Sequence, residues 1–314
     1  MLRKLSIQIL TVGGLIGIAA PHMAAAQVSG FDLGSMGGFA VVIDNVSNFQ
    51  LTSDSGITGS LGIGSMTGSP QFSGGSVSGA VAFASATLPN GVTAGTPGSG
   101  TGGTQGSIAA GVASVGSAIS TMSTLSSYYV GQTGTTLSLN LGNSSTTVNV
   151  ETGTKAANGS AYVFDVGTSF NVTNGGTITI SGSASDYVVF NFAASSTLKF
   201  NDSIVLAGGI TSDHVLFDYT GTNQISSAAN GAYVYGVLDA PNAALSLDNI
   251  KFDGRIMAGK VNTNSSIQSG AYVTQPTTYS PPASVPEPRS VVLLLVALGG
   301  LAWVKTHRLR YDRL

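Results

Sequence analysis

Three residues that could act on a polysaccharide alternate along one short segment: Lys251, Asp253 and Arg255. Alternate positions of a β-strand point to the same side, so we predict that these side chains share one strand face. A lyase or glycosidase needs paired carboxylates or a basic residue in a groove, and these three are the best candidates in the chain. The alternative is a solvated strand edge that carries charge. We favour the edge and expect neither catalytic residues nor an enzyme.

His214 is the only histidine outside the two ends of the chain. A Ser-His-Asp hydrolase would have to combine it with Asp186 or Asp213, yet the sequence has no Gly-x-Ser-x-Gly motif. We therefore predict a strand residue with a satisfied hydrogen bond. Residues 254–261, GRIMAGKV, nearly match a phosphate-binding loop, but Val261 replaces the required Ser or Thr.

Oxygen ligands for calcium are the remaining chemical possibility. Six aspartates are expected near turns: Asp202, Asp213, Asp218, Asp239, Asp248 and Asp253. No dense Asp/Asn loop of the kind that calcium needs is present, so these residues predict Asx turns at chain corners. The chain also has no cysteine. We expect no metal and no cofactor.

The composition indicates which elements must position these residues. With 43 glycines among 314 residues, 42% hydrophobic and only 8% charged residues, the chain is typical of a Gly-rich all-β protein. Runs such as TTLSLNLG, TITISG and AYVYGVL are β-branched or aromatic and are separated by Asn, Gly and Asp turns.

Three pairs of segments repeat within this β-rich body. Residues 59–65 are matched twenty residues later by 79–85, and residues 236–247 are matched eighteen residues later by 254–265. Residues 186–192, DYVVFNF, are matched twenty-seven residues later by DHVLFDY. Alternating apolar residues that recur at such periods are typical of a β-solenoid, in which each coil buries its inward side chains on the next. We predict a parallel β-helix-like body.

One segment has a helical period instead. Ile108, Val112, Val115, Ile119 and Met122 are spaced by four, three, four and three residues, which places them on one side of a helix. We predict one long helix over residues 107–127, packed along the solenoid. The Gly-rich stretch 91–106 before it predicts a loop.

The N-terminus has the three parts of a secretory signal peptide: a basic start, an apolar run, and small residues that end at Ala26. We predict cleavage between Ala26 and Gln27, which removes residues 1–26 and leaves a body of residues 27–275. From residue 27 to residue 285, five basic residues stand against twelve acidic ones, a balance of −7. A nucleic-acid partner is therefore not expected.

The C-terminus also has three parts. A Pro-rich linker, 276–288, ends in the motif Val285, Pro286, Glu287 and Pro288. Residues 289–314 then contain Arg289, a fourteen-residue uncharged run and, after this run, four basic residues, Lys305, Arg308, Arg310 and Arg313. This pattern predicts a short transmembrane helix whose basic tail stays in the cytoplasm.

The order of these C-terminal parts resembles the PEP-CTERM sorting signal of Gram-negative bacteria. The resemblance implies that an exosortase-type membrane protease cuts near the motif. It also implies that the contact with the inner membrane is transient, and that the body passes to the cell surface or the extracellular matrix.

The body resembles a second family, over roughly residues 39–269. FAVVIDNVSNFQLTSDSGITGSLGIG from Phe39, and above all LDAPNA at 238–243, are similar to the choice-of-anchor A domain. The resemblance implies a surface protein related to ice-binding-type β-solenoids, and it implies no particular activity.

These observations favour an exported, non-enzymatic protein of the cell surface or biofilm matrix, with a structural or adhesive role. Its weakly charged Asn/Ser/Thr-rich surface would bind extracellular polysaccharide through many shallow hydrogen bonds. Two alternatives stay open: a glycan-active lyase or glycosidase, and an ice- or surface-binding protein. Ice binding would require a Thr-x-Thr motif in every coil, but Thr177-Ile178-Thr179 does not recur at the coil spacing.

Overall fold

The computed structural model describes residues 30–276, apart from 53, 90–91, 93–105, 143, 173–175 and 228–230. These residues form parallel β-ladders and one α-helix, α1 (Ala113–Tyr129). Three short 3-10 turns accompany them: η1 (Gly34–Gly38), η2 (Val150–Thr152) and η3 (Ser212–His214). Among the described residues, no helix is long and apolar enough to cross a membrane. The predicted signal peptide, nearly all of the linker and the predicted C-terminal span lie outside these ranges.

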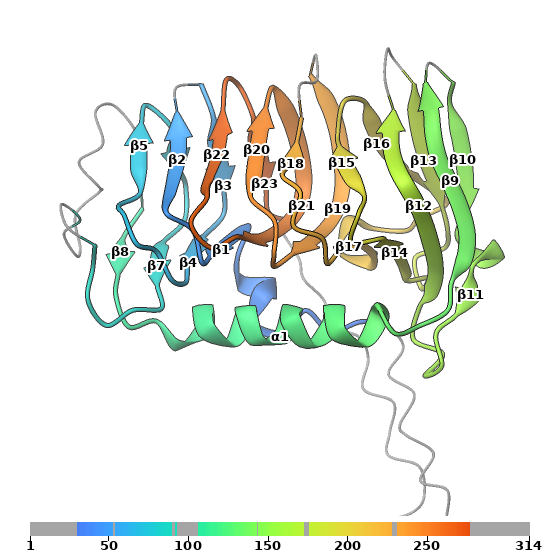
Figure 1. Cartoon of the computed structure of the whole chain (residues 1–314), viewed down its shortest axis with the longest axis horizontal. Coiled ribbons are helices and arrows are strands. Elements are labelled where there is room, and N and C mark those ends of the chain that lie inside the picture. The colour runs from blue at the N-terminus through green and yellow to red at the C-terminus, as the bar shows by residue number, and fades with distance from the viewer. Residues whose placement is uncertain are drawn as a thin grey trace, which may run out of the picture. The chain divides into compact units, whose positions relative to one another are not determined.

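Successive passes of the chain stack in register and create three flat faces, which confirms the predicted parallel β architecture of a solenoid (Figure 1). The helix face packs against α1. Its strands, in spatial order, are β8 (Ile108–Ala109), β7 (Val81–Phe83), β4 (Leu61–Ile63), β1 (Val41–Asp44), β21 (Ile250–Gly259), β19 (Ala232–Ala240), β17 (Val215–Tyr219), β14 (Val188–Phe192), β12 (Tyr162–Val172) and β9 (Thr135–Gly142).

The second face is called the amide face, after its outward Gln and Asn side chains. Its strands, in spatial order, are β5 (Gln71–Ser73), β2 (Asn48–Thr52), β22 (Asn264–Gln268), β20 (Leu245–Asp248), β18 (Ile225–Ser226), β15 (Thr197–Lys199) and the C-terminal parts of β12 and β9.

The third face is called the tyrosine face, after two exposed tyrosines on β19 and β23. Its strands, in spatial order, are β6 (Ser76–Val77), β3 (Gly56–Thr58), β23 (Tyr272–Thr274), the N-terminal halves of β21 and β19, β16 (Ser203–Ala207), β13 (Thr177–Ser181) and β10 (Thr146–Asn149). One short strand, β11 (Thr154–Lys155), instead pairs antiparallel with the start of β12.

The coils are not stacked in the order of the chain. The described chain begins in the middle of the stack with β1, and proceeds outward through β4 and β7 to β8. Helix α1 then runs along the stack toward β9, from which the coils return through β12, β14, β17 and β19 (Figure 1). The returning strand β21 finally pairs with β1, with Ile256 opposite Val41. The last coils therefore lie between the first coils and the middle of the chain.

The interior of the solenoid is filled by columns of inward side chains that stack from coil to coil. Phe164, Phe190 and Phe217 stack on consecutive coils with ring centroids 5.5 Å and 5.6 Å apart. All three are buried in the main apolar core. The match at twenty-seven residues between 186–192 and 213–219 is this stacking, since Val188 pairs with Val215 and Phe190 with Phe217.

The other predicted repeats also correspond to stacked coils. Leu61 pairs with Val81 at the spacing of twenty residues, and Gly236 pairs with Gly254 at the spacing of eighteen. The alternating pattern therefore predicts both the inward side chains and their partners on the next coil.

The outer core lies between the helix face and α1. The helix buries Val115, Ala118, Met122, Ser126 and Tyr129, which follow one another at steps of three or four residues. They pack on outward side chains that recur from coil to coil: Val42, Val163, Val189, Leu216, Val237 and Met257. This arrangement confirms the predicted helix along the solenoid.

The predicted start of the helix at residue 107 is wrong. Ile108 and Ala109 form β8 and pair with Val81 and Ala82, and Gly111 then turns the chain with φ +68°. An apolar residue at position 108 fits a helix stripe and a strand equally well, and the open edge of β7 provides hydrogen bonds that favour the strand.

Candidate binding faces

The three candidate catalytic residues do not lie on one face, so this prediction is wrong. Strand β21 turns a corner at Gly254, whose φ is +156°. Before the corner, Lys251 and Asp253 pair with β23 on the tyrosine face. After the corner, the strand pairs with β1 on the helix face, and this half carries Arg255. Alternate residues share a face only along a straight strand, and the sequence did not predict the bend between Asp253 and Arg255.

The corner is formed by two stacked glycines. Gly236, with φ +148°, precedes Gly254 in the adjacent coil and lies directly opposite it. A Cβ on Gly254 would overlap the backbone carbonyl of Gly236. The glycines of GRIMAGKV are thus required by the close approach of two coils, and this segment is a strand and not a phosphate-binding loop.

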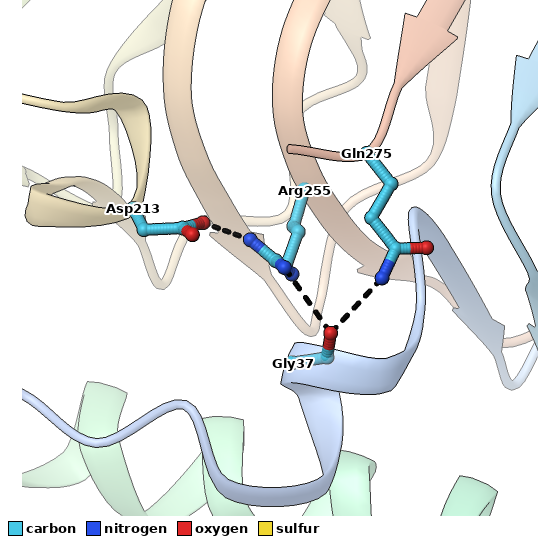
Figure 2. Close-up of polar contacts among 4 residues, drawn as sticks. All are labelled: Gly37, Asp213, Arg255 and Gln275. Atoms are coloured by element: carbon cyan, nitrogen blue, oxygen red, sulfur yellow. Dashed lines mark hydrogen bonds and ion pairs between the residues drawn. The ribbon is translucent and has the colours of Figure 1, made fainter. Parts of the chain in front are cut away.

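Arg255 is a fully buried structural residue (Figure 2). Its guanidinium forms an ion pair with Asp213, which is also buried. It also donates a 3.1 Å hydrogen bond to the carbonyl oxygen of Gly37 in η1, and that oxygen accepts a second hydrogen bond of 3.0 Å from Nε2 of Gln275. Arg255 therefore holds η1 and the end of the body against the solenoid, and it cannot reach a polysaccharide.

His214 lies at the end of η3, directly before strand β17, and not within a strand as predicted. Its half-buried ring stacks on Tyr187, with ring centroids 3.8 Å apart and an angle of 24° between the planes. Burial lowers the pKa of His214, while a backbone hydrogen bond with Asp186 and the charge of that residue oppose the shift. The ring is therefore neutral at pH 7 and acts in packing.

Three of the six aspartates, Asp213, Asp218 and Asp239, are buried, which the sequence did not predict. Asp218 and Asp239 do not lie at turns; they lie opposite each other on β17 and β19, under α1. The signal that could have found Asp218 is its position inside an otherwise apolar motif, where the preceding coil has Asn191. Among the described residues, no three His, Asp or Glu side chains come together to hold a metal.

Asn191, Asp218 and Asp239 form a row across β14, β17 and β19, and polar contacts connect this row to α1. Ser126 Oγ lies 2.6 Å from Oδ1 of Asp218, and Asn191 Nδ2 donates to the carbonyl oxygen of Tyr129 over 2.8 Å. Burial raises the pKa of Asp218 to about 7. Burial, and then the nearby Asp218, raise the pKa of Asp239 well above its ordinary value. Neither oxygen of Asp239 has a hydrogen-bond partner within the described ranges. Burial without a hydrogen-bond partner therefore favours the protonated form of Asp239.

The amide face is one of two faces that α1 leaves open. Adjacent coils are joined by side-chain amides: Gln50 Nε2 donates to Gln71 Oε1 over 3.2 Å, and Asn48 Nδ2 donates to Asn264 Oδ1 over 3.1 Å. One outward row continues in register across six coils through Gln71, Gln50, Ser266, Ser246, Ser226 and Lys199. The result is a flat row of hydrogen-bond donors and acceptors at the strand spacing of about 4.8 Å.

The tyrosine face differs in its middle coils. Tyr233, Lys251 and Tyr272 lie side by side in register on β19, β21 and β23. The two tyrosines are 43% and 42% exposed, respectively. Lys251 Nζ donates to the hydroxyl of Tyr233 over 2.9 Å, and this hydrogen bond raises the pKa of Lys251. With Tyr235, Asp253 and Thr274, these residues line a hollow of ≈ 280 Å³.

The predicted sorting and cleavage residues cannot be placed. Ala26, Gln27, the motif Val285 to Pro288, and the basic residues Lys305, Arg308, Arg310 and Arg313 all lie outside the described residues. They remain sequence predictions.

The fold defines a class of protein: a β-solenoid with an out-of-order coil stack, one face covered by a helix and two faces open for contact. Residues 26–269 match the family model described as a putative ice-binding-like adhesive domain, and the chain belongs to this family. The choice-of-anchor A and PEP-CTERM resemblances stay predictions. A comparison of the sequence with curated proteins found no match.

Solved structures share the fold at low sequence identity. An ice-binding protein from the Antarctic ascomycete Antarctomyces psychrotrophicus is 18% identical with a TM-score of 0.53, over 80% of this chain and 100% of that chain. One from an Antarctic Flavobacteriaceae bacterium is 18% identical with a TM-score of 0.56, over 80% of this chain and 48% of that one. One from an Arctic yeast is 18% identical with a TM-score of 0.50, over 82% and 98%.

Proposed function

We propose that the protein is an exported adhesive that binds extracellular polysaccharide through the amide face. The observation that carries the proposal is the outward row of amides and hydroxyls, ending in the ammonium group of Lys199, that continues in register across six coils. The adhesive description of the family supports the same role.

The amide face is suited to a hydroxyl-rich polymer because its side chains are already held in place. The hydrogen bonds between Gln50 and Gln71 and between Asn48 and Asn264 restrict the rotamers of four amide side chains. Less side-chain entropy is then lost when a sugar hydroxyl binds. Each contact is weak, but contacts repeated along a polymer add up.

The test is retention of the full chain on the native exopolysaccharide. The double variant Gln50→Ala/Asn264→Ala removes one partner of each amide pair, and we expect its retention to fall well below that of the wild type. Thr179→Ala, which truncates an outward half-buried side chain on the tyrosine face, is the matched control and should leave retention unchanged. Equal retention of the wild type and the double variant would exclude the amide face as the adhesive surface.

We further propose export with removal of residues 1–26, followed by sorting through the C-terminal tail. The support is the order of the signal peptide, the Val285 to Pro288 motif, the apolar run and the basic residues. The intact mass of the protein from membrane and matrix fractions tests this proposal. A matrix form without residues 1–26 and without the tail is expected. A single membrane form that still ends at Leu314 would mean a permanent anchor.

Ice binding is the second candidate function. It is favoured by two pairs of stacked threonines on neighbouring coils of the tyrosine face, Thr147 with Thr179 and Thr58 with Thr274. The residue that follows Thr179 in its row is Val205, and the residue that follows Thr274 is Asp253, so neither pair extends to a third threonine in that direction. We therefore expect no thermal hysteresis from the purified protein. Measured hysteresis that disappears in Thr179→Tyr would make ice the ligand.

A further inference from the structure

We propose that Tyr272, Lys251, Tyr233 and Asp253 on the tyrosine face form a binding site for one neutral pyranose ring of a polysaccharide. This site rests on the proposed adhesive function and identifies a specific contact for it on a different face from the amide row. Four observations carry the inference: the exposure of Tyr272 beside Gly56, the polar groups around it, the two adjoining hollows and the charge of the body.

Tyr272 offers an exposed aromatic ring, which serves as a platform beside the neighbouring strand. A Cβ built on Gly56 of β3 would come within 3.1 Å of both Cδ1 and Cε1 of the Tyr272 ring. This edge of the ring therefore occupies the space that a side chain at position 56 would fill. Since the side chain is still 42% exposed, the rest of the ring offers its surface to solvent. An exposed aromatic ring of this kind can stack on the apolar C–H face of a pyranose.

The groups beside the platform suit sugar hydroxyls. Lys251 is held by its 2.9 Å hydrogen bond to the Tyr233 hydroxyl, and its Nζ lies 4.8 Å from the centroid of that ring. Its ammonium keeps further donors for hydroxyl oxygens. The half-buried carboxylate of Asp253, two residues along the same strand, supplies an acceptor. A pyranose presents both kinds of partner, with several hydroxyls around an apolar face.

The hollow has room for one ring and opens toward a second hollow. The first has a volume of ≈ 280 Å³, and the second, of ≈ 310 Å³, shares Asp253 and Thr274 with it. The second hollow is otherwise lined by polar or small residues: Thr211, Ser212, Asp213, Gln275 and Pro276. A sugar chain bound at Tyr272 could therefore continue past Asp253 around the corner of the solenoid.

The charge of the protein favours a neutral glycan over an acidic one. Residues 27–285 carry a balance of −7, and the lining of the site contains one cation, Lys251, and one carboxyl group, Asp253. A polyanion such as a uronate polymer would be repelled by the body, while a neutral polymer would not.

Native affinity electrophoresis of the full chain tests the site. The probes are hydroxyethylcellulose, dextran, galactomannan and xyloglucan as neutral polysaccharides, and alginate as the acidic one. We expect at least one neutral polysaccharide to retard the wild type and alginate to have no effect. Tyr272→Ala should weaken binding by about tenfold, since central aromatic contacts contribute most of the affinity at such sites. Tyr272→Phe should keep most of the binding.

A second pair of variants separates a specific site from a general surface effect. Lys155 Nζ lies 4.8 Å from the ring centroid of Tyr162, which is the same distance as between Lys251 Nζ and the ring of Tyr233. Lys251→Ala should weaken binding, and the matched control Lys155→Ala should not. Gly56→Val should weaken binding by displacing the Tyr272 ring, with circular dichroism to confirm the fold.

The outcomes distinguish this site from the proposed function. If no neutral polysaccharide retards the wild type, or if Tyr272→Ala binds as the wild type does, the sugar site is wrong. If retention on the native exopolysaccharide is lost only in Gln50→Ala/Asn264→Ala, the adhesive function of the amide face stands and the sugar site on the tyrosine face does not contribute to it. Retardation by alginate alone would replace the neutral ligand with an acidic one.

Discussion

Asp218→Asn should change how the stability of the solenoid depends on pH. The carboxyl of Asp218 is buried between β17 and α1, and burial raises its pKa from 3.8 to about 7. In the unfolded chain, the group returns to its ordinary pKa. Between about pH 4 and pH 7 the folded state therefore binds more protons than the unfolded state, so the free energy of unfolding falls as the pH rises. Above pH 7 this contribution is lost and the slope disappears.

The size of the effect follows from the width of this window. Each unit of difference between the two pKa values corresponds to about 1.36 kcal/mol. From pH 5 to pH 7 the wild type should lose roughly 2 kcal/mol through Asp218, because the slope falls to half its full value as the pH reaches the folded pKa of about 7. The side-chain amide of the Asp218→Asn variant cannot ionise, so the stability of the variant relative to the wild type should rise by about this amount over the same range.

Urea unfolding followed by circular dichroism at pH 5, 6, 7 and 8 measures this difference. Comparing the variant with the wild type removes the shared contribution of His214, whose lowered pKa gives the opposite slope. Asp239 faces Asp218 from β19, and the main cause of its raised pKa, burial, is the same in both proteins. Ser126→Ala provides a directional check: the hydroxyl of Ser126 lowers the pKa of Asp218, so its removal should extend the sloping region to higher pH. A constant difference between Asp218→Asn and the wild type at all four pH values would refute the reasoning.

Two further substitutions probe the corner of strand β21 and the buried arginine that follows it. Gly254→Ala places a Cβ against the carbonyl of Gly236, so the two coils must separate. We expect the thermal midpoint of unfolding to fall by several degrees, and a midpoint equal to that of the wild type would show that the corner adapts freely. Asp213→Ala leaves the buried Arg255 without its carboxylate and should lower the free energy of unfolding in urea by about 3 to 5 kcal/mol. The double variant Asp213→Ala/Arg255→Met removes the unpaired charge as well and should recover part of this loss. If the double variant recovers nothing, the uncompensated charge is not the cause.

The sequence by itself determined the repeat. Its alternating apolar residues and its spacings of eighteen, twenty and twenty-seven residues predict the inward columns and the partners of neighbouring coils, such as Phe190 with Phe217. These features are local, because each inward side chain packs on the equivalent residue of the next coil. The helix along the solenoid was also predictable, although its first turn was not, because β8 takes those residues into the sheet.

Only the tertiary structure decided which coils meet out of sequence and which polar residues are open. The pairing of β21 with β1 joins segments from opposite ends of the body, and no local period encodes it, because every coil offers the same backbone hydrogen bonds to a neighbour. The corner at Gly254 then separates Lys251 from Arg255, so that η1 covers Arg255 while Lys251 stays exposed. The exposure of Tyr272 is likewise set by its neighbour across the sheet, Gly56, which lies far away in the sequence but provides the space for the ring.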